Sequence, residues 1–304
     1  MRTTRRSRAF GAILVALALL TAACSGDSGE SAKADTPITV ASFGFSESVI
    51  LAEIYAHALE ANGYSVERRL NLGPRELIFP ELEAGNIDLL PEYVGSSLVV
   101  GFGLDAPSDL DAAVEALGAA FADLDMDVLD PAPGEDKNVF VVTQDFASAT
   151  GVTSVSDLAG AGDITLGGPP ECEARDTCYQ GLLGTYGLSN ISFESIQEGS
   201  ARVAALENGE IDLSLLFSTQ PVITAKGFVA LNDDAGLIAP ENIIPVVSRE
   251  VTDAFGDDVT SLLNSISAKI TTDVLLDLNG KVELDGESEA DVAAQWLADN
   301  GLDG

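Results

Sequence analysis

The chain has 304 residues, of which 46% are hydrophobic, so it can form one or two domains with sizeable cores and is not wholly disordered. Its 49 acidic residues outnumber its 15 Lys and Arg, and the formal net charge of -34 excludes nucleic acid as a partner because such a surface repels phosphates. One histidine and three cysteines are too few ligands for most zinc sites, and we expect no metal or cofactor. The sequence also lacks the GxxxxGK[ST] motif of nucleotide-binding loops and the GxSxG motif of many hydrolases, which argues against both activities.

Residues 1–23 have the pattern of a bacterial lipoprotein signal peptide. Four arginines among the first eight residues precede a charge-free run over 9–23, which is too short for the roughly 20 apolar residues of a membrane-spanning helix. The run ends in LTAAC, which resembles a lipobox with Thr21 at its usual aliphatic position. We expect Cys24 to carry the lipid and residues 24–36 to form a flexible tether, so the protein lies outside the cytoplasm, anchored to the outer face of the cell membrane. The alternative is an ordinary signal peptide with an accidental cysteine.

An α/β pattern begins after the tether. ITVAS (38–42) is typical of a buried strand, and apolar residues recur on one face of the helix expected from Ser46 to Gly63. A strand in SVERRLNLG, a helix from Arg75 to Ala84 and a strand in NIDLLPEY follow, and the last of these leads into a loop. This alternation predicts a mainly parallel sheet flanked by helices.

The same order of elements returns about 126 residues later. ITLGG (164–168) precedes a helical stretch and NISFESI, and LENGEIDL (206–213) matches LEAGNIDL (82–89). Two similar lobes are the simplest explanation, although any two βαβ units share part of this pattern.

We therefore expect two lobes with a ligand cleft between them, because domain junctions are preferred locations for small-molecule sites. Lobe one would comprise 37–133 and 241–304, and lobe two 134–240. The chain would cross between the lobes in VLDPAP and LIAPENIIP. In the last helix, Ser288 is expected to be the N-cap and Trp296 to lie on the apolar face.

Several motifs carry a family resemblance over essentially the whole mature chain. FGFSESVILAEIYAHALEANGY, LGPRELIFPELEAGNIDLLPEYVG, KNVFVVT, GPPECEARDTCYQGLLGTYGL, IDLSLLFST and ADVAAQWLADNGL occur in that order. Together they resemble the substrate-binding proteins of osmoprotectant ABC importers, which bind glycine betaine, choline or carnitine. The resemblance implies a type II periplasmic-binding-protein clamshell, a monomer without enzymatic activity that passes a small cationic or zwitterionic ligand to a separate permease and its ATPase.

A quaternary ammonium group donates no hydrogen bonds, so proteins hold it against aromatic faces. Carried over from the family motifs, the predicted ligand-binding residues are Tyr93, Phe140, Phe217, Ser48, Ser96, Glu241 and Asn242. Phe140 and Phe217 stand where the family has the second and third cage tyrosines, and no aromatic residue stands at the fourth position, near Glu241. An inward-facing Glu241 would favour choline-like cations over betaines, whereas a solvated Glu241 would have no such role.

Two arginines allow two interpretations. Arg75 in LGPRE and Arg175 in CEARD could bind a ligand carboxylate, but pairing with acidic residues of the protein is the favoured prediction. A same-fold binder of an aromatic or neutral molecule remains an alternative function. An exported enzyme is disfavoured because no nucleophile–base pair is evident.

Cys172 and Cys178 lie in one loop, PPECEARDTCYQG. An oxidising compartment favours their pairing, and the loop lacks the further ligands that a metal would need. We predict a disulfide within lobe two.

Overall fold

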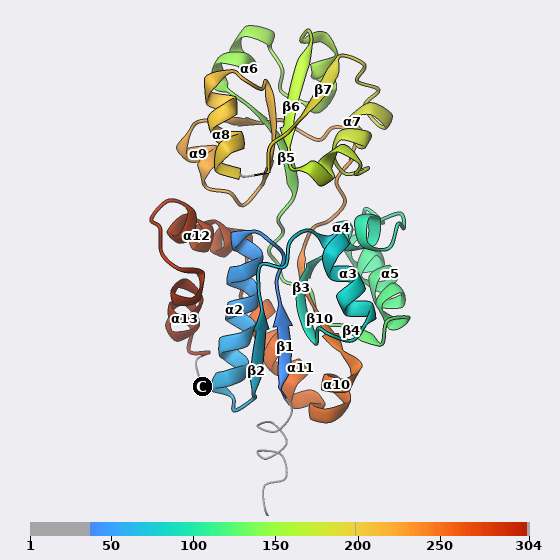
Figure 1. Cartoon of the computed structure of the whole chain (residues 1–304), viewed down its shortest axis with the longest axis vertical. Coiled ribbons are helices and arrows are strands. Elements are labelled where there is room, and N and C mark those ends of the chain that lie inside the picture. Colours follow the sequence, from blue (N-terminus) through green and yellow to red (C-terminus); the bar gives the residue numbers. More distant parts are fainter. Residues whose placement is uncertain (1–36, 198, 303–304) are drawn as a thin grey trace, which may run out of the picture.

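The computed structural model describes residues 37–197 and 199–302, which form two lobes joined by two connecting segments (Figure 1). The predicted signal peptide, tether and lipid-bearing Cys24 lie outside the described residues. Within the described part of the chain, no helix has the length and apolarity needed to cross a membrane.

Lobe one is built from both ends of the described chain. Its N-terminal part contains β1 (Ile38–Ala41), α2 (Ser46–Ala61), β2 (Val66–Arg69), α3 (Arg75–Glu83), β3 (Leu89–Tyr93), α4 (Val94–Ser96), η1 (Ser97–Gly101), α5 (Leu110–Ala122) and β4 (Met126–Val128). Its C-terminal part contains β10 (Ile243–Ser248), α10 (Arg249–Phe255), α11 (Asp257–Ser267), α12 (Thr272–Glu283) and α13 (Glu289–Asn300).

Lobe two is formed by the middle of the chain. Its elements are β5 (Asn138–Val142), α6 (Gln144–Thr150), η2 (Val155–Gly160), β6 (Ile164–Gly168), η3 (Pro170–Glu173), α7 (Tyr179–Gly184), β7 (Ile191–Ser195), α8 (Gly199–Asn208), β8 (Leu213–Phe217), α9 (Val222–Ala225) and β9 (Val229–Ala230).

The two sheets have the same topology. Their strand orders are β2-β1-β3-β10-β4 and β7-β6-β8-β5-β9. In each sheet the first three strands are parallel, and the fourth, which enters directly from the other lobe, is antiparallel to both of its neighbours. The predicted α/β clamshell and the internal repeat are confirmed, with β1 and β6 at the positions expected from ITVAS and ITLGG.

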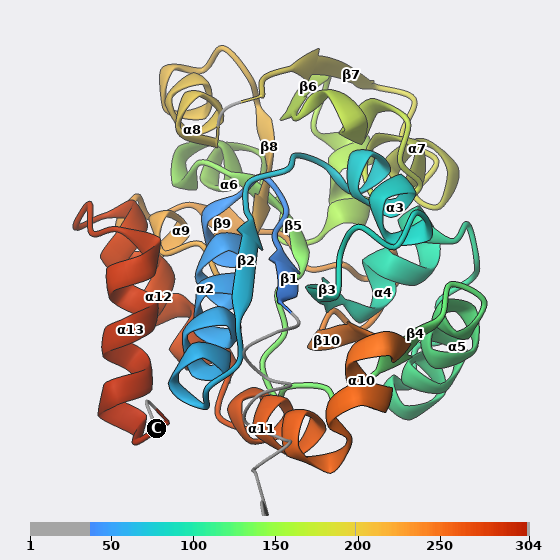
Figure 2. The ribbon, with the colours of Figure 1, turned by 60° about the horizontal axis from the view of Figure 1, so that its bottom comes forward.

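Helices cover both faces of the lobe-one sheet. Figure 2 shows α2, α12 and α13 on one side and α3, α4 and α5 on the other. The predicted apolar face of α2 is buried, with Ile50, Leu51 and Ile54 at most 1% exposed. The last helix also begins as predicted, because the Ser288 side chain accepts a hydrogen bond from the Asp291 N–H, and Trp296 is buried.

The segment after β3 differs from the expected loop. The strand continues through Pro91 to Tyr93, and helical turns follow at once. A proline is tolerated inside this strand because Pro91 lies opposite Pro245 of β10, so two residues without an N–H face each other.

The lobes are connected by residues 129–137 and 231–242, between β4 and β5 and between β9 and β10. The two segments contact each other near lobe one, where Glu135 forms an isolated antiparallel bridge with Asn242. The proposed boundaries, 133/134 and 240/241, fall within these segments and stay a prediction.

Candidate functional site

A cavity of about 710 Å³ lies between the lobes. Lobe one contributes the turn before α2, the start of α3, the end of β3 and one face of α12; lobe two contributes the end of β8 and the starts of η3 and α8. The connecting segment before β5 adds Asp136. Both lobes and one crossover therefore supply its walls.

Aromatic rings from both lobes meet in this cavity. The ring centroids of Phe45 and Phe217 are 5.3 Å apart across the cleft, and those of Phe45 and Tyr93 are 5.9 Å apart. Phe43 stacks on Phe45 with 6.1 Å between centroids, but its ring is also covered by the Arg75 guanidinium at 4.6 Å. Phe45, Tyr93 and Phe217 form what we call the aromatic cluster.

Strand direction explains which predicted aromatics reach the cavity. Tyr93 and Phe217 end β3 and β8 and line it, whereas Phe140 lies outside its lining, 3% exposed in the core of lobe two. Because β5 is antiparallel to β8, the start of β5 lies at the cleft, and Asn138 is the residue paired with Phe217. The assumption that Phe140 lies at a ligand-facing strand end does not fit this geometry, so we leave Phe140 out of the proposed site.

Glu47, in the first turn of α2, is buried at the junction of the lobes. Its Oε1 accepts a hydrogen bond from the Tyr93 hydroxyl at 2.8 Å, and its Oε2 accepts one from Thr219 Oγ1 at 2.6 Å and one from Asn279 Nδ2 at 2.7 Å. Thr219 belongs to lobe two, so this network joins the lobes. Burial raises the pKa of the Glu47 carboxyl despite these hydrogen bonds.

Asp136 is the second buried carboxyl group in the cavity wall. Its Oδ1 accepts hydrogen bonds from the Thr219 N–H at 3.0 Å and from Ser218 Oγ at 3.2 Å. Burial, and then the charge of Glu47, raise the pKa of Asp136 well above its ordinary value. Such a pair gains electrostatically from a nearby cation.

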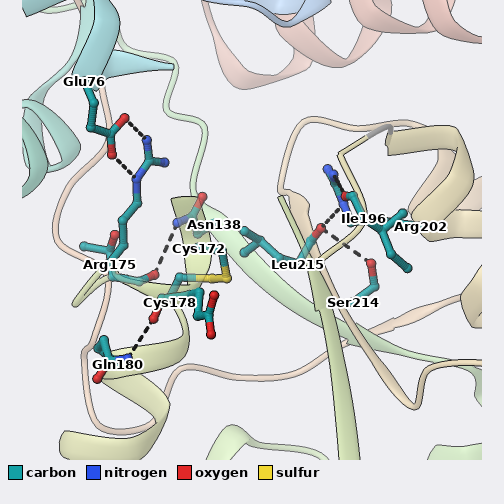
Figure 3. Close-up of a disulfide and its surroundings, with 12 residues drawn as sticks. Glu76, Asn138, Cys172, Arg175, Cys178, Gln180, Ile196, Arg202, Ser214 and Leu215 are labelled. Carbon is teal, nitrogen blue, oxygen red and sulfur yellow. Dashed lines mark hydrogen bonds and ion pairs between the residues drawn. A yellow bond between two sulfur atoms is a disulfide. The ribbon is translucent and has the colours of Figure 1, made fainter. Parts of the chain in front are cut away.

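Both arginines singled out in the sequence are paired with acidic residues, as predicted. Arg75 binds Glu92 through two hydrogen bonds of 3.0 and 2.6 Å, and both side chains are buried. Arg175 binds Glu76 in the same two-bonded manner at 3.0 and 2.8 Å, from lobe two to α3 of lobe one (Figure 3). These contacts pair two of the three arginines of the cavity lining with carboxylates, while the third, Arg202, donates to backbone carbonyls.

Arg175 lies in the loop closed by the predicted cysteine pair. Cys172 and Cys178 form a disulfide in the structure, with their Cα atoms 5.2 Å apart (Figure 3). The Asn138 side chain donates to the Thr177 carbonyl of the same loop at 3.3 Å. The loop thereby ties the cleft end of β5 to the segment that carries Arg175.

The remaining predicted site residues mostly shape the backbone. Ser48 is buried and its Oγ accepts a hydrogen bond from the Phe43 N–H at 2.9 Å, which fixes the turn before α2. Asn242 donates to the Ala132 carbonyl at 3.0 Å and so links the two connecting segments. Ser96 lines the cavity, whereas Ser48 and Asn242 lie outside its lining.

Glu241 has neither of the two roles considered from sequence. It is 3% exposed, so it is not solvated, and it lies outside the cavity lining. Its carboxyl group accepts hydrogen bonds from Ser96 Oγ at 2.7 Å and Ser96 N–H at 3.0 Å. It therefore connects a crossover segment to the helical turn after β3.

Phe45, Asp136, Asn138 and Asn279 are among the cavity residues that sequence reasoning missed. It assigned no ligand-binding role to Glu47 either. Phe45 and Glu47 occur in the FGFSES motif, where an aromatic and an acid flank a helix start. No local signal marks Asn279, which reaches the cavity from α12, far along the chain. Among the described residues, no group of three or more His, Cys, Asp or Glu is placed to hold a metal ion.

The fold and the interlobe cavity define a two-lobed substrate-binding protein. The chain belongs to the family described as the substrate binding domain of the ABC-type glycine betaine transport system, whose model matches residues 36–299. It is thus a substrate-binding protein of this ABC transporter family, as the sequence resemblance implied.

Relatives are similar to the chain over most of its length, and a solved structure shares its fold. The glycine betaine-binding protein YehZ of Escherichia coli (strain K12) is 24% identical over 287 residues, covering 88% of this chain and 92% of the relative. The carnitine transport binding protein OpuCC of Listeria monocytogenes serotype 1/2a (strain 10403S) is 25% identical over 296 residues, covering 96% and 95%. The crystal structure of a glycine betaine/carnitine/choline ABC transporter has a similar fold, with a TM-score of 0.71 and 23% identity over 88% of this chain and 100% of that one.

Proposed function

We propose that this protein captures a small quaternary ammonium compound, of the glycine betaine, choline or carnitine class, in the interlobe cavity and delivers it to an ABC permease and its ATPase. The observation that carries the proposal is the aromatic cluster, in which Phe45 and Tyr93 of lobe one meet Phe217 of lobe two. Aromatic faces attract a cation that cannot donate hydrogen bonds, each by about 0.5 to 2 kcal/mol when water is excluded.

Binding and lobe closure are coupled in this proposal. The rings of Phe45 and Phe217 face each other across the cleft, with 5.3 Å between their centroids. A cation held between them would replace the ring–ring contact with two ring–cation contacts. Neither lobe alone supplies both aromatic faces. A ligand between them therefore binds more tightly when the lobes are closed, and this difference in affinity shifts the protein toward the closed conformation.

The proposal places the protein outside the cytoplasm as a monomer anchored through lipid on Cys24. Tethering keeps the binding lobes close to the permease and raises their local concentration. Mass spectrometry of protein extracted from membranes without reductant tests this proposal. A lipid-modified Cys24 at the mature N-terminus and a closed Cys172–Cys178 disulfide support it; a mature form beginning elsewhere, or two free thiols, contradicts it.

The ligand class is tested by isothermal calorimetry with glycine betaine, choline, carnitine and a panel of neutral aromatic compounds. Saturable binding of at least one quaternary ammonium compound, with none to the neutral panel, supports the proposal. Binding only to a neutral aromatic compound overturns it and favours a same-fold receptor for a different ligand.

A further inference from the structure

Glu47 and Asp136 form a pair of buried carboxyl groups at the junction of the lobes. They are 4% and 6% exposed, and both line the cavity. Thr219 binds both of them: its hydroxyl donates to Glu47 Oε2 at 2.6 Å and its N–H to Asp136 Oδ1 at 3.0 Å. A side-chain hydrogen bond also joins the two carboxyl groups to each other. Because an ionised carboxylate only accepts hydrogen bonds, one member of the pair must carry a proton.

The groups that surround the pair stabilise it with neutral hydrogen bonds. Tyr93 and Asn279 donate to Glu47, and the Ser218 hydroxyl donates to Asp136. Burial raises the pKa of both carboxyl groups, and the charge of Glu47 raises the pKa of Asp136 further. Two ionised carboxylates that lie together in a site with little water repel each other, so the pair keeps one proton between its members.

The basic residues of the cavity lining are engaged by other groups. Each of the four that the structure describes there has partners outside the pair: Arg75 binds Glu92, Arg175 binds Glu76, Lys226 binds Glu207, and Arg202 donates to three backbone carbonyls. The other acids of the lining are Glu171, Glu207 and Glu283, and burial and then the charge of Glu47 raise the pKa of Glu283. With the basic groups engaged, a bound cation is the source of the positive charge that would let both carboxyl groups of the pair ionise.

We infer that the Glu47–Asp136 pair holds one proton in the unliganded protein and releases it when a cation binds in the cavity, so that ligand capture is coupled to proton release. The inference rests on the proposed function and adds a regulation of the same site. Only an O–H bond breaks: the proton passes to the solvent, both carboxylates are then ionised, and the positive charge of the ligand balances the added negative charge. Because such coupling is reciprocal, a lower pH must weaken ligand binding.

Calorimetry on the wild-type protein counts the protons released. Choline is the probe because its quaternary ammonium group does not titrate, and each titration is repeated at the same pH in two buffers whose ionisation enthalpies differ. The difference between the two observed enthalpies gives the protons released per ligand. Between about pH 5 and pH 9 we expect a maximum of at least about half a proton, with an affinity that rises about three- to tenfold per pH unit around it. Binding without proton release throughout this range would overturn the inference.

The Asp136→Asn variant assigns the proton to the pair. It removes one titrating group and leaves Glu47 without an ionised neighbour, so proton release at the pH of the wild-type maximum should fall at least about threefold. Glu241→Gln is the matched control, because Glu241 is also buried and the pKa of its carboxyl group is raised to about 7, but it lies outside the cavity lining. Release that persists in a folded Asp136→Asn variant, or that is lost in Glu241→Gln, contradicts the assignment.

The proposed function and this inference fail in different ways. If no quaternary ammonium compound binds, the proposed function is wrong; if one binds without releasing a proton, only the inference is wrong. Infrared spectroscopy of the unliganded Glu241→Gln variant tests the pair without a ligand, and it also decides the issue if Asp136→Asn does not fold. The carbonyl band of a protonated, buried carboxyl group should be present at about pH 7 and be lost when choline is added. Absence of the band before choline is added, or its persistence at saturation, overturns the inference.

Discussion

Single residues at the cleft belong both to the proposed ligand site and to the contact between the lobes. Phe217 is half-buried at the end of β8, and its only ring partner among the described residues is Phe45 of the opposite lobe. Removing its ring takes away one wall of the proposed cation site without opening the lobe-two core, where Phe140 and its neighbours pack. Phe217 is therefore a position where binding can be altered with little effect on folding.

Phe217→Ala should weaken binding of the quaternary ammonium ligand by about 1 to 2 kcal/mol, which is tenfold or somewhat more. Phe217→Tyr should hold or improve affinity because tyrosine is a better cation host. Calorimetric dissociation constants test both variants, with Phe146→Ala as the control, since Phe146 is also partly buried but lies outside the cavity lining. Unchanged affinity in a folded Phe217→Ala variant would remove Phe217 from the site.

Glu241 should make the stability of the protein depend on pH near neutrality. Burial raises the pKa of its carboxyl group from 4.5 to about 7, despite the Ser96 hydrogen bonds. Between these two values the Glu241 carboxyl is protonated in the folded protein but ionised in the unfolded chain. Its contribution to the free energy of unfolding is therefore fully present below about pH 4.5 and is lost as the pH rises through about 7.

Denaturant unfolding of the wild type and of Glu241→Gln at about pH 5 and about pH 8 measures this effect. The wild type should lose on the order of 2 to 3 kcal/mol more than the variant between the two conditions. Glu47 and Asp136 titrate in both proteins, so the difference between the profiles isolates Glu241. Parallel profiles would show that Glu241 does not titrate in this range.

Of the predicted site residues that line the cavity, two end a parallel strand and the third, Ser96, lies in the helical turn after one of them. Tyr93 and Phe217 follow runs of alternating or continuous apolar residues, and both reach the cavity. Asn279 and Asp136 reach it only through tertiary contacts, and sequence spacing carries no information about those. The position of Phe140 depends on the direction of β5, which is antiparallel to β8. The apolar pattern of KNVFVVT is the same for either direction, so the sequence could not predict it.

Elements of the fold determine where the crossover segments lie. The Gly95 N–H, in the turn after β3, donates to the Pro240 carbonyl at 2.9 Å. A Cβ atom at Gly95 would lie 2.9 Å from both Ala239 Cβ and the Pro240 oxygen, and 3.2 Å from Glu241 Oε1. Only glycine lets the second crossover pack this closely against lobe one.

Gly95→Ala should therefore destabilise the protein by about 1 to 3 kcal/mol, because backbone atoms must move to admit the methyl group. Gly118→Ala is the matched control: Gly118 lies inside α5, a Cβ there meets nothing within 4 Å, and the change should stabilise by about 0.5 to 1 kcal/mol. Thermal or denaturant unfolding measures both. Equal stability of the two variants would contradict the close approach at Gly95.

The secondary-structure elements themselves were largely predictable. Each βαβ unit has a strand of branched apolar residues, a helix with one apolar face and a glycine after it, and these signals are local. The pairing of β10 between β3 and β4 was not, since its partners are more than 100 residues away in sequence. The contact of α12 with the cavity could not be predicted either, because α12 is far in sequence from the other elements that line the cavity.

At the scale of the whole molecule, a few polar contacts hold the two lobes together over the cavity. Thr219 binds Glu47, Asn279 binds the Thr219 carbonyl, and Arg175 binds Glu76. The first two are buried beside the proposed site, and the third lies at its rim. Under the proposed function, the contacts between the lobes and the ligand site therefore involve neighbouring residues.

The central claim is that the cavity recognises positive charge with aromatic rings from both lobes. The most direct test compares, by calorimetry on the wild-type protein, the affinities for choline and for its neutral isostere, in which carbon replaces nitrogen. The isostere has the same shape and is more hydrophobic, so a site that selected shape or apolar surface would prefer it. Our account predicts that choline binds at least about tenfold more tightly, through attraction to the rings and the buried carboxylates. Equal affinity, or a preference for the neutral isostere, would contradict it.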